Sequence, residues 1–323
     1  MNDATLPSSR IKNFPMAWFS MIMGFTGFSI AWMRAETVYD VGFAPSCVLR
    51  WVALGLFVLV AVLYAAKAAK YPGAVREEFT HPVKQAFGPT ISIGMILLSI
   101  VLLHDVPRLS FWLWSVGTLL HLALTLYVMS SWMHHTKYEI THMNPAWFIP
   151  VVGNILVPIA GLHHAPVEIS WFFFSIGLFF WPVLTAILFY RLIFHTSLPE
   201  RFVPTLFIFI APPAVGFISW YNLGGQVDAF AHVLYGVALF FALLLAVQAN
   251  YFVRLKFFLS WWAYSFPLAA LTIATMIMAK ETGLGFYRGL GIVLLAILTL
   301  LIVLLLVRTA IAVARREICV EGH

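Results

Sequence analysis

Ten long apolar segments follow one another along the chain, separated by short polar stretches. A helix needs about 20 mostly apolar residues to cross a hydrocarbon core about 30 Å thick. The segments cover residues 14–33, 50–66, 86–103, 111–133, 145–162, 169–191, 203–221, 228–252, 258–279 and 285–308. No small-residue cleavage pattern follows the first segment, so we interpret it as a retained helix. The pattern predicts an all-α integral membrane protein, with residues 1–323 as a single transmembrane domain that has short terminal tails.

The composition strengthens this prediction. Hydrophobic residues make up 62% of the chain and charged residues only 10%, which leaves too little polar surface to cover a soluble globule. The glycine-rich phosphate loop of ATP-driven pumps is absent from the sequence. We therefore expect neither an enzyme nor a nucleic-acid-binding protein.

Prolines distinguish alternate segments. Nine of the 17 prolines lie in odd-numbered segments, one in an even-numbered segment, and the rest in loops. An interior proline removes a backbone donor, so a membrane helix tolerates it where packing or a cavity satisfies the freed carbonyl. Glycine and proline are also common in membrane helices generally, which is the alternative explanation for any one of them. We take seven residues of the odd segments as pore-kink and pore-lining candidates: Gly24, Gly94, Pro150, Pro158, Pro212, Pro213 and Pro267.

Positive charge is distributed unequally between the two sets of loops. Fourteen of the 19 lysines and arginines fall in the terminal tails and the even-to-odd loops, and five fall on the other side. Cytoplasmic loops retain positive charge, so we predict a multi-pass protein of the cell (inner) membrane with both termini in the cytoplasm. A basic cytoplasmic mouth would also attract anions within a Debye length.

The central portions of the odd segments contain no Asp, Glu, Lys or Arg. Their polar groups are uncharged and could together line a neutral path, although a hydroxyl in a membrane helix most often bonds back to its own backbone. These groups are Ser20, Thr26, Ser29, Ser92, Ser99, Asn154, Ser219, Ser265, Thr272 and Thr275. We interpret His121 and His232, both in even segments, as hydrogen-bond partners between helices and not as proton relays.

Clustered histidines raise the alternative of a metal enzyme. His134, His135 and His142 lie in a predicted cytoplasmic loop, whereas His163 and His164 lie in an outer loop. The membrane would separate the two groups, leaving at most three ligands together and no carboxylate motif. We therefore assign no catalytic residue, no metal site and no cofactor.

The ninth segment carries the most specific motif, Ser260-Trp261-Trp262-Ala263-Tyr264-Ser265-Phe266-Pro267-Leu268. Further matching motifs are Asn13-Phe14-Pro15, His81-Pro82-Val83 and Asp228-Ala229-Phe230-Ala231. Together they resemble the tellurite-resistance/dicarboxylate transporter (TDT) family, which includes bacterial TehA and the plant slow-type guard-cell anion channels. The resemblance extends over essentially the whole chain.

The resemblance implies ten helices arranged as five antiparallel hairpins, with odd helices forming an inner pore ring and even helices an outer ring. It also implies a homotrimer with one pore in each subunit, and it identifies Phe266 as the gate. A phenyl ring is apolar and large enough to exclude water from a narrow neutral pore.

We therefore expect an anion channel for small inorganic anions such as chloride and nitrate, with small anions and membrane lipid as its partners. The alternative is a secondary transporter or exporter of C4-dicarboxylates, tellurite or sulfite. Specific binding of a doubly charged substrate would favour an Arg or Lys in the path, and we identify none in the odd segments.

Overall fold

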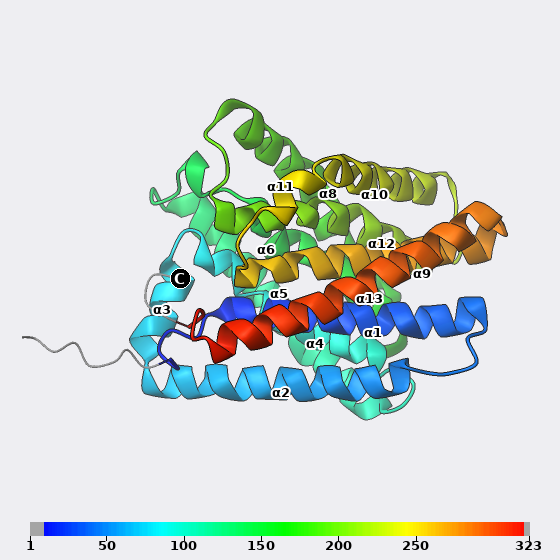
Figure 1. Cartoon of the computed structure of the whole chain (residues 1–323), viewed down its shortest axis with the longest axis horizontal. Coiled ribbons are helices and arrows are strands. Elements are labelled where there is room, and N and C mark those ends of the chain that lie inside the picture. The colour runs from blue at the N-terminus through cyan, green and yellow to red at the C-terminus, as the bar shows by residue number, and fades with distance from the viewer. Residues whose placement is uncertain (1–9, 320–323) are drawn as a thin grey trace, which may run out of the picture.

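The computed structural model describes residues 10–319, which are almost entirely helical and contain no strand. Ten helical spans are long and apolar enough to cross a membrane, and they run roughly along the horizontal axis of Figure 1. In chain order, spans 1 to 10 are Met16–Tyr39, Ser46–Lys70, Lys84–Val101, Pro107–His134, Pro145–His164, Val167–Phe194, Glu200–Gly224, Ala229–Val247, Leu259–Thr282 and Gly285–Ala314. The predicted number and type of elements are confirmed. Most spans extend beyond the predicted apolar limits, because polar residues continue the helices at their ends.

The odd-numbered spans are not uniform α-helices. Each one begins with a tighter 3₁₀ segment (η), and span 5 contains a second such segment in its middle. Their elements are η1 (Met16–Trp18) and α1 (Phe19–Tyr39); η2 (Lys84–Phe87) and α4 (Thr90–Val101); η4 (Pro145–Trp147), α6 (Phe148–Val152), η5 (Gly153–Leu156) and α7 (Val157–His164); η6 (Glu200–Ile210) and α9 (Ala211–Gly224); η7 (Leu259–Tyr264) and α12 (Ser265–Thr282).

Each even-numbered span, in contrast, is one continuous α-helix: α2 (Ser46–Lys70), α5 (Pro107–His134), α8 (Val167–Phe194), α10 (Ala229–Val247) and α13 (Gly285–Ala314). Two short elements that we did not predict are α3 (Pro72–Thr80) and η3 (Ile140–His142), and the end of the predicted segment 228–252 forms a separate short helix, α11 (Ala249–Val253). They lie in loops between an even span and the next odd one. In Figure 1, α3 is at the left end of the molecule, near the last described residues.

Burial separates the two sets of spans. In the most apolar part of each odd span, 72–89% of the residues are buried, against 17–39% in the even spans. The described residues include many large exposed hydrophobic side chains, and none of them lies in an odd span. The odd spans are therefore the inner helices, and the even spans are the outer helices that cover them.

The inner helices contact one another in a closed cycle. Helix α1 packs against α4, α4 against α7, α7 against α9, α9 against α12, and α12 back against α1. Each inner helix also packs against the outer helix that follows it in the sequence. Five antiparallel hairpins thus surround a common axis.

Side chains from neighbouring helices satisfy the carbonyl groups around the prolines of span 5. Thr125 donates a hydrogen bond to the carbonyl of Pro150 at 2.6 Å, and Ser219 donates to the carbonyl of Ile155 at 2.5 Å. The indole Nε1 of Trp114 donates to the carbonyl of Val157 at 3.0 Å. These bonds join span 5 to α5 and α9. The carbonyls that Pro150 and Pro158 leave without a helical donor are those of Ala146 and Asn154, four residues earlier.

Candidate functional site

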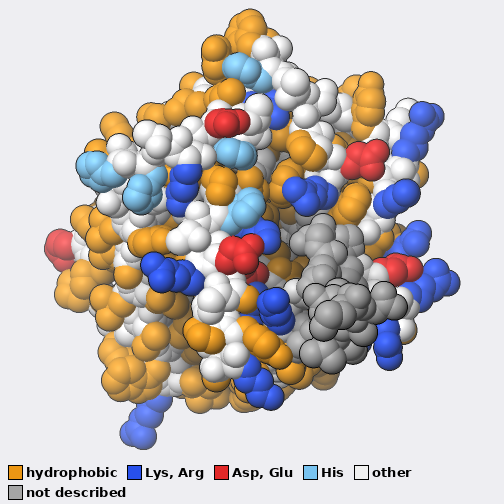
Figure 2. Space-filling view, turned by 90° about the vertical axis from the view of Figure 1, so that its left-hand side faces the viewer, with side chains coloured by type: hydrophobic (Ala, Val, Ile, Leu, Met, Phe, Trp, Pro, Cys, Tyr) orange, Lys and Arg blue, Asp and Glu red, His pale blue; other side chains and the backbone are white. Residues whose placement is uncertain are grey.

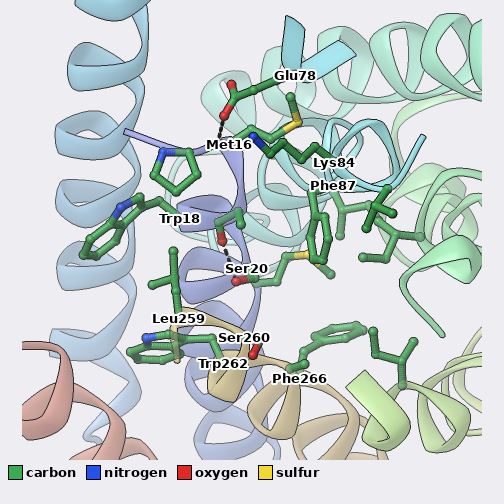
Figure 3. A pocket seen from close by; sticks show the side chains of 18 of the residues that line it. Met16, Trp18, Ser20, Glu78, Lys84, Phe87, Leu259, Ser260, Trp262 and Phe266 are labelled. Atoms are coloured by element: carbon green, nitrogen blue, oxygen red, sulfur yellow. Dashed lines mark hydrogen bonds between the residues drawn. The ribbon is translucent and has the colours of Figure 1, made fainter. Parts of the chain in front are cut away.

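A cavity of about 490 Å³ occupies one half of the axis between the inner helices. All five inner spans contribute lining residues, for example Met23, Ile93, Val152, Pro212 and Trp262. Figure 3 shows this wall, with Glu78 and Lys84 at one end of the cavity and Phe266 at the other. We call this space the large cavity.

The large cavity opens at the end of the molecule where the inner spans begin. Four exposed charged residues line its mouth, namely Lys12, Glu77, Lys84 and Arg201. Figure 2 faces this end and shows many Lys and Arg side chains with fewer acidic ones among the described residues. The mouth is therefore a basic surface, which we call the basic end.

His81 lies in the wall of this mouth, and its Nδ1 accepts hydrogen bonds from the backbone amides of Val83 (3.1 Å) and Lys84 (3.3 Å). Burial lowers the pKa of His81, and the neighbouring positive charges of Lys84, His142 and Arg201 lower it further. The His-Pro-Val motif thus forms a turn at the start of the third span, held by a neutral histidine.

A buried ion pair fixes the beginning of the first inner helix. Lys67 of α2 lies 2.9 Å from Glu78 of α3, and both side chains are almost fully buried. Lys67 also donates to the carbonyl of Phe14 at 2.9 Å, while Glu78 accepts from the backbone amide of Met16 at 3.4 Å and from Tyr64 at 3.0 Å. Helices α2 and α3 therefore hold the start of the first inner span at the mouth of the large cavity.

A second, much smaller cavity of about 30 Å³ lies further along the axis. This volume has room for about two water molecules. All five inner spans line it, and every lining side chain is apolar. The lining residues are Gly27, Ile30, Leu97, Ile100, Leu156, Ile159, Val215, Ile218, Phe266, Ala270 and Ile273.

Three residues line both cavities and therefore separate them: Leu156, Val215 and Phe266. Phe266 is the largest of the three and the only aromatic one. Its ring lies against Gly27 of α1, where an added Cβ would come within 3.2 Å of the ring. The preceding turn of α1 is even closer to α12, because a Cβ on Gly24 would lie 1.8 Å from Ser265 Oγ.

The predicted site residues are distributed over the two cavities and their surroundings. Phe266, Pro267 and Pro212 line the large cavity. The remaining candidates, Gly24, Gly94, Pro150, Pro158 and Pro213, are buried and line neither cavity. The Phe-Pro pair lies in the first half of span 9, directly after the η7 segment and Ser265.

The hydroxyl groups of the inner helices do not form a polar path. Of the ten uncharged polar groups identified in the sequence, only Ser20 lines a cavity. Several others donate to carbonyls in their own helix, such as Ser265 to Trp262 and Thr272 to Leu268. His121 is fully buried and hydrogen-bonded to Ser92 at 2.9 Å, as expected for a partner between helices.

Two features of the inner helices were not recognised in the sequence. Leu156 and Val215 carry no distinguishing motif, and only the packing of the inner helices brings them to Phe266. Helix α1 also continues to Tyr39 and so includes Arg34, which lies beyond the predicted segment 14–33. Within residues 10–319, no group of three His, Cys, Asp or Glu side chains is placed to hold a metal ion.

Comparison with known proteins gives a consistent family assignment. Residues 13–310 match the family model described as SLAC1, voltage-dependent anion channel. The chain is 30% identical to the S-type anion channel SLAH3 of Arabidopsis thaliana over 96% of its own length, and it spans about half (50%) of that relative. It is 28% identical to the uncharacterized transporter MJ0762 of Methanocaldococcus jannaschii, covering 88% of this chain and 91% of the relative.

A third relative is the tellurite resistance protein TehA homolog of Haemophilus influenzae, which is 26% identical and covers 86% of this chain and 83% of the relative. The family match and these relatives confirm the resemblance drawn from the sequence motifs. The matched residues 13–310 include parts of all ten spans. The chain belongs to the family whose model is described as SLAC1, voltage-dependent anion channel.

Proposed function

We propose that the protein is an anion channel that passes small inorganic anions, such as chloride and nitrate, down their gradient through each subunit. The observation that carries this proposal is the pair of cavities on the axis, each lined by all five inner spans and separated at Phe266. A transported ion would cross the large cavity, the constriction at Phe266 and the small cavity in turn.

The charges along this path favour anions without holding them tightly. The mouth carries Lys12, Lys84 and Arg201, which raise the local concentration of anions. All five inner spans begin at the basic end, so their positive dipole ends flank the large cavity. No charged side chain lines the small cavity. Attraction at the entrance combined with weak binding along the path is the balance that conduction requires.

In this proposal the pathway is closed at Phe266. Leu156, Val215 and the phenyl ring form an apolar constriction, and such constrictions stop ions by excluding water. Opening would require the ring to move away from the axis. Gly27 offers no side chain to block the space beside the ring.

We further propose a homotrimer in the cell membrane with the basic end in the cytoplasm. The unequal distribution of Lys and Arg supports this orientation, and the apolar outer helices offer surfaces for lipid and for neighbouring subunits. Cross-linking in native membranes should capture a trimer. Capture of monomers and dimers alone would contradict this assembly.

The proposed function is tested by electrical recording from the purified protein in planar bilayers. A channel should give currents that reverse near the equilibrium potential of chloride or nitrate, with no coupling to protons. The alternative is a secondary transporter or exporter of C4-dicarboxylates, tellurite or sulfite. Proton-dependent uptake of malate into proteoliposomes, without a conductive anion current, would favour that alternative and overturn the channel.

A further inference from the structure

Two histidines from different spans meet at the end of the molecule opposite the basic end. His104 follows α4 in the loop that leads to α5, and His163 lies in the last turn of α7. Their ring centres are 6.4 Å apart, and the ring planes are inclined by 75°. Helices α4 and α7 are neighbours in the inner ring. The pair therefore lies where the ends of spans 3 and 5 come together.

Both imidazoles are free to bind a ligand. The two side chains are exposed, and neither forms a hydrogen bond within residues 10–319. A neutral imidazole keeps a lone pair on one ring nitrogen, which makes histidine the commonest metal ligand among side chains. Imidazole nitrogen is a donor that suits zinc, copper and nickel. The pair thus offers two accessible donors of the same kind.

The separation of the two rings is compatible with one shared ion. Zinc binds an imidazole nitrogen at about 2.0–2.1 Å, so two rings on one tetrahedral ion have centres about 5 Å apart, and rings on opposite sides of an ion about 6.5 Å. The observed 6.4 Å is at the long end of this range. Because the last torsion of a histidine side chain is broad, a movement of about 1 Å lets both exposed rings turn a nitrogen to the same ion.

Other polar groups near the pair are engaged elsewhere. The Nε2 atom of His164 is hydrogen-bonded to the hydroxyl of Ser110 at 2.8 Å. Asp105, which follows His104, is paired with Arg50. Within residues 10–319, no group of three His, Cys, Asp or Glu side chains is placed to hold a metal ion. Water would complete the coordination, so such a site would hold an ion reversibly, unlike the resident metal of an enzyme.

We propose that His104 and His163 together form a binding site for a divalent transition-metal ion of the zinc and copper class. The partial negative charge at the C-terminal end of α7 favours a cation beside His163. A bound ion would link the ends of spans 3 and 5. The site does not depend on whether the protein conducts anions. Simple packing of two aromatic rings is the alternative explanation of the contact.

Zinc titration of the purified protein in detergent tests the site. By isothermal titration calorimetry, with any affinity tag removed, one zinc ion should bind to each chain through this pair. Loss of a hydrogen-bond partner of a metal ligand lowers metal affinity about 10- to 100-fold, so loss of a ligand itself, in His104→Ala or in His163→Ala, should lower it at least tenfold. Unchanged affinity in either variant would overturn the shared site.

The double variant His134→Ala/His135→Ala is the matched control. It removes two exposed histidines at the end of α5, which lies at the basic end. The zinc affinity of this variant should equal that of the wild type. A fall as large as that in His104→Ala would place the zinc ion elsewhere and overturn the proposal.

The melting temperature gives a second readout. Zinc should raise it in the wild type but not in His104→Ala or His163→Ala, since a ligand stabilises the state that binds it. Calcium prefers oxygen ligands and should raise it in none of the three proteins. Without zinc, the two variants should melt as the wild type does, because the substituted side chains are exposed. A lower melting temperature of both variants without zinc, combined with no effect of zinc on the wild type, would show that the rings only pack together.

Discussion

The inner and outer helices of this protein are equally able to cross a membrane by length and apolar content, yet they differ in almost every other respect. The inner spans are largely buried, begin as 3₁₀ segments and contain eight of the ten prolines that lie within spans, whereas the outer spans are exposed continuous α-helices. Apolar content therefore identifies which segments cross the membrane. Prolines within the spans indicate which of them are covered by other helices.

Packing demands differ between glycines that lie between helices and those on the outer surface. Gly24 of the inner helix α1 lies against Ser265 and Gly177 of the outer helix α8 lies against Ile155, whereas Gly55 of α2 has no neighbour near a Cβ position. The outer helices contribute to the pathway indirectly, as α2 does by holding the start of the first inner span through Lys67. The following predictions test this division of roles.

The largest effect on stability is expected where α2 and α3 contact the start of the first inner span. Replacing Lys67 with Met leaves Glu78 buried without its partner, and breaking a buried ion pair in this way costs about 3–5 kcal/mol. We expect a matching fall in the free energy of unfolding, measured by denaturant titration in mild detergent. The double variant Lys67→Met/Glu78→Gln should lose less than the sum of the single losses. Strict additivity would contradict a direct interaction between the two side chains.

A smaller effect should distinguish a glycine packed between helices from one on the outer surface. Gly24→Ala places a methyl group 1.8 Å from Ser265 Oγ and 2.7 Å from its Cβ, so α1 and α12 must move apart, at a cost of about 1–3 kcal/mol. The matched change Gly55→Ala meets no atom and should stabilise α2 by about 0.5–1 kcal/mol. Melting temperatures of the two variants should therefore shift in opposite directions. Shifts of the same sign and size would contradict the difference in packing.

The smallest effect concerns the pH dependence of stability at the mouth. Because burial and nearby positive charges lower the pKa of His81, the unfolded state binds its proton more readily than the folded state. The stabilisation from the neutral side chain is therefore complete above the unfolded pKa of about 6.5 and is lost as the pH falls below it. His81→Asn keeps an acceptor for the turn and should make the loss of melting temperature between about pH 7 and pH 5 shallower. An identical pH profile would show that His81 does not titrate in this way.

Much of the fold was predictable because membrane crossing depends on local composition. The ten apolar segments, the asymmetry of the prolines and the role of the odd set as inner helices follow from the sequence or from its family resemblance. Helix ends were less predictable, since charged residues such as Arg34 continue α1 when other helices cover them.

The residues that line and separate the two cavities were only partly predictable. Phe266 came from the motif around it, while Leu156 and Val215 look like any other apolar residue until the inner helices bring them together. The expected polar lining was also not found, because most hydroxyls in these helices bond to nearby backbone carbonyls. The Lys67–Glu78 pair joins residues of two elements, one of which, α3, has no apolar pattern long enough to predict it.

The central claim is that Phe266 closes a pathway between the two cavities, and the most direct test is the anion current of Phe266→Ala in planar bilayers or oocytes. Removing the ring should raise the current at least about tenfold at equal protein amount, which corresponds to a barrier lower by about 1.4 kcal/mol. Phe240→Ala removes the same ring from the exposed face of α10 and should leave the current unchanged. Folded Phe266→Ala protein whose current equals that of the wild type would contradict the account.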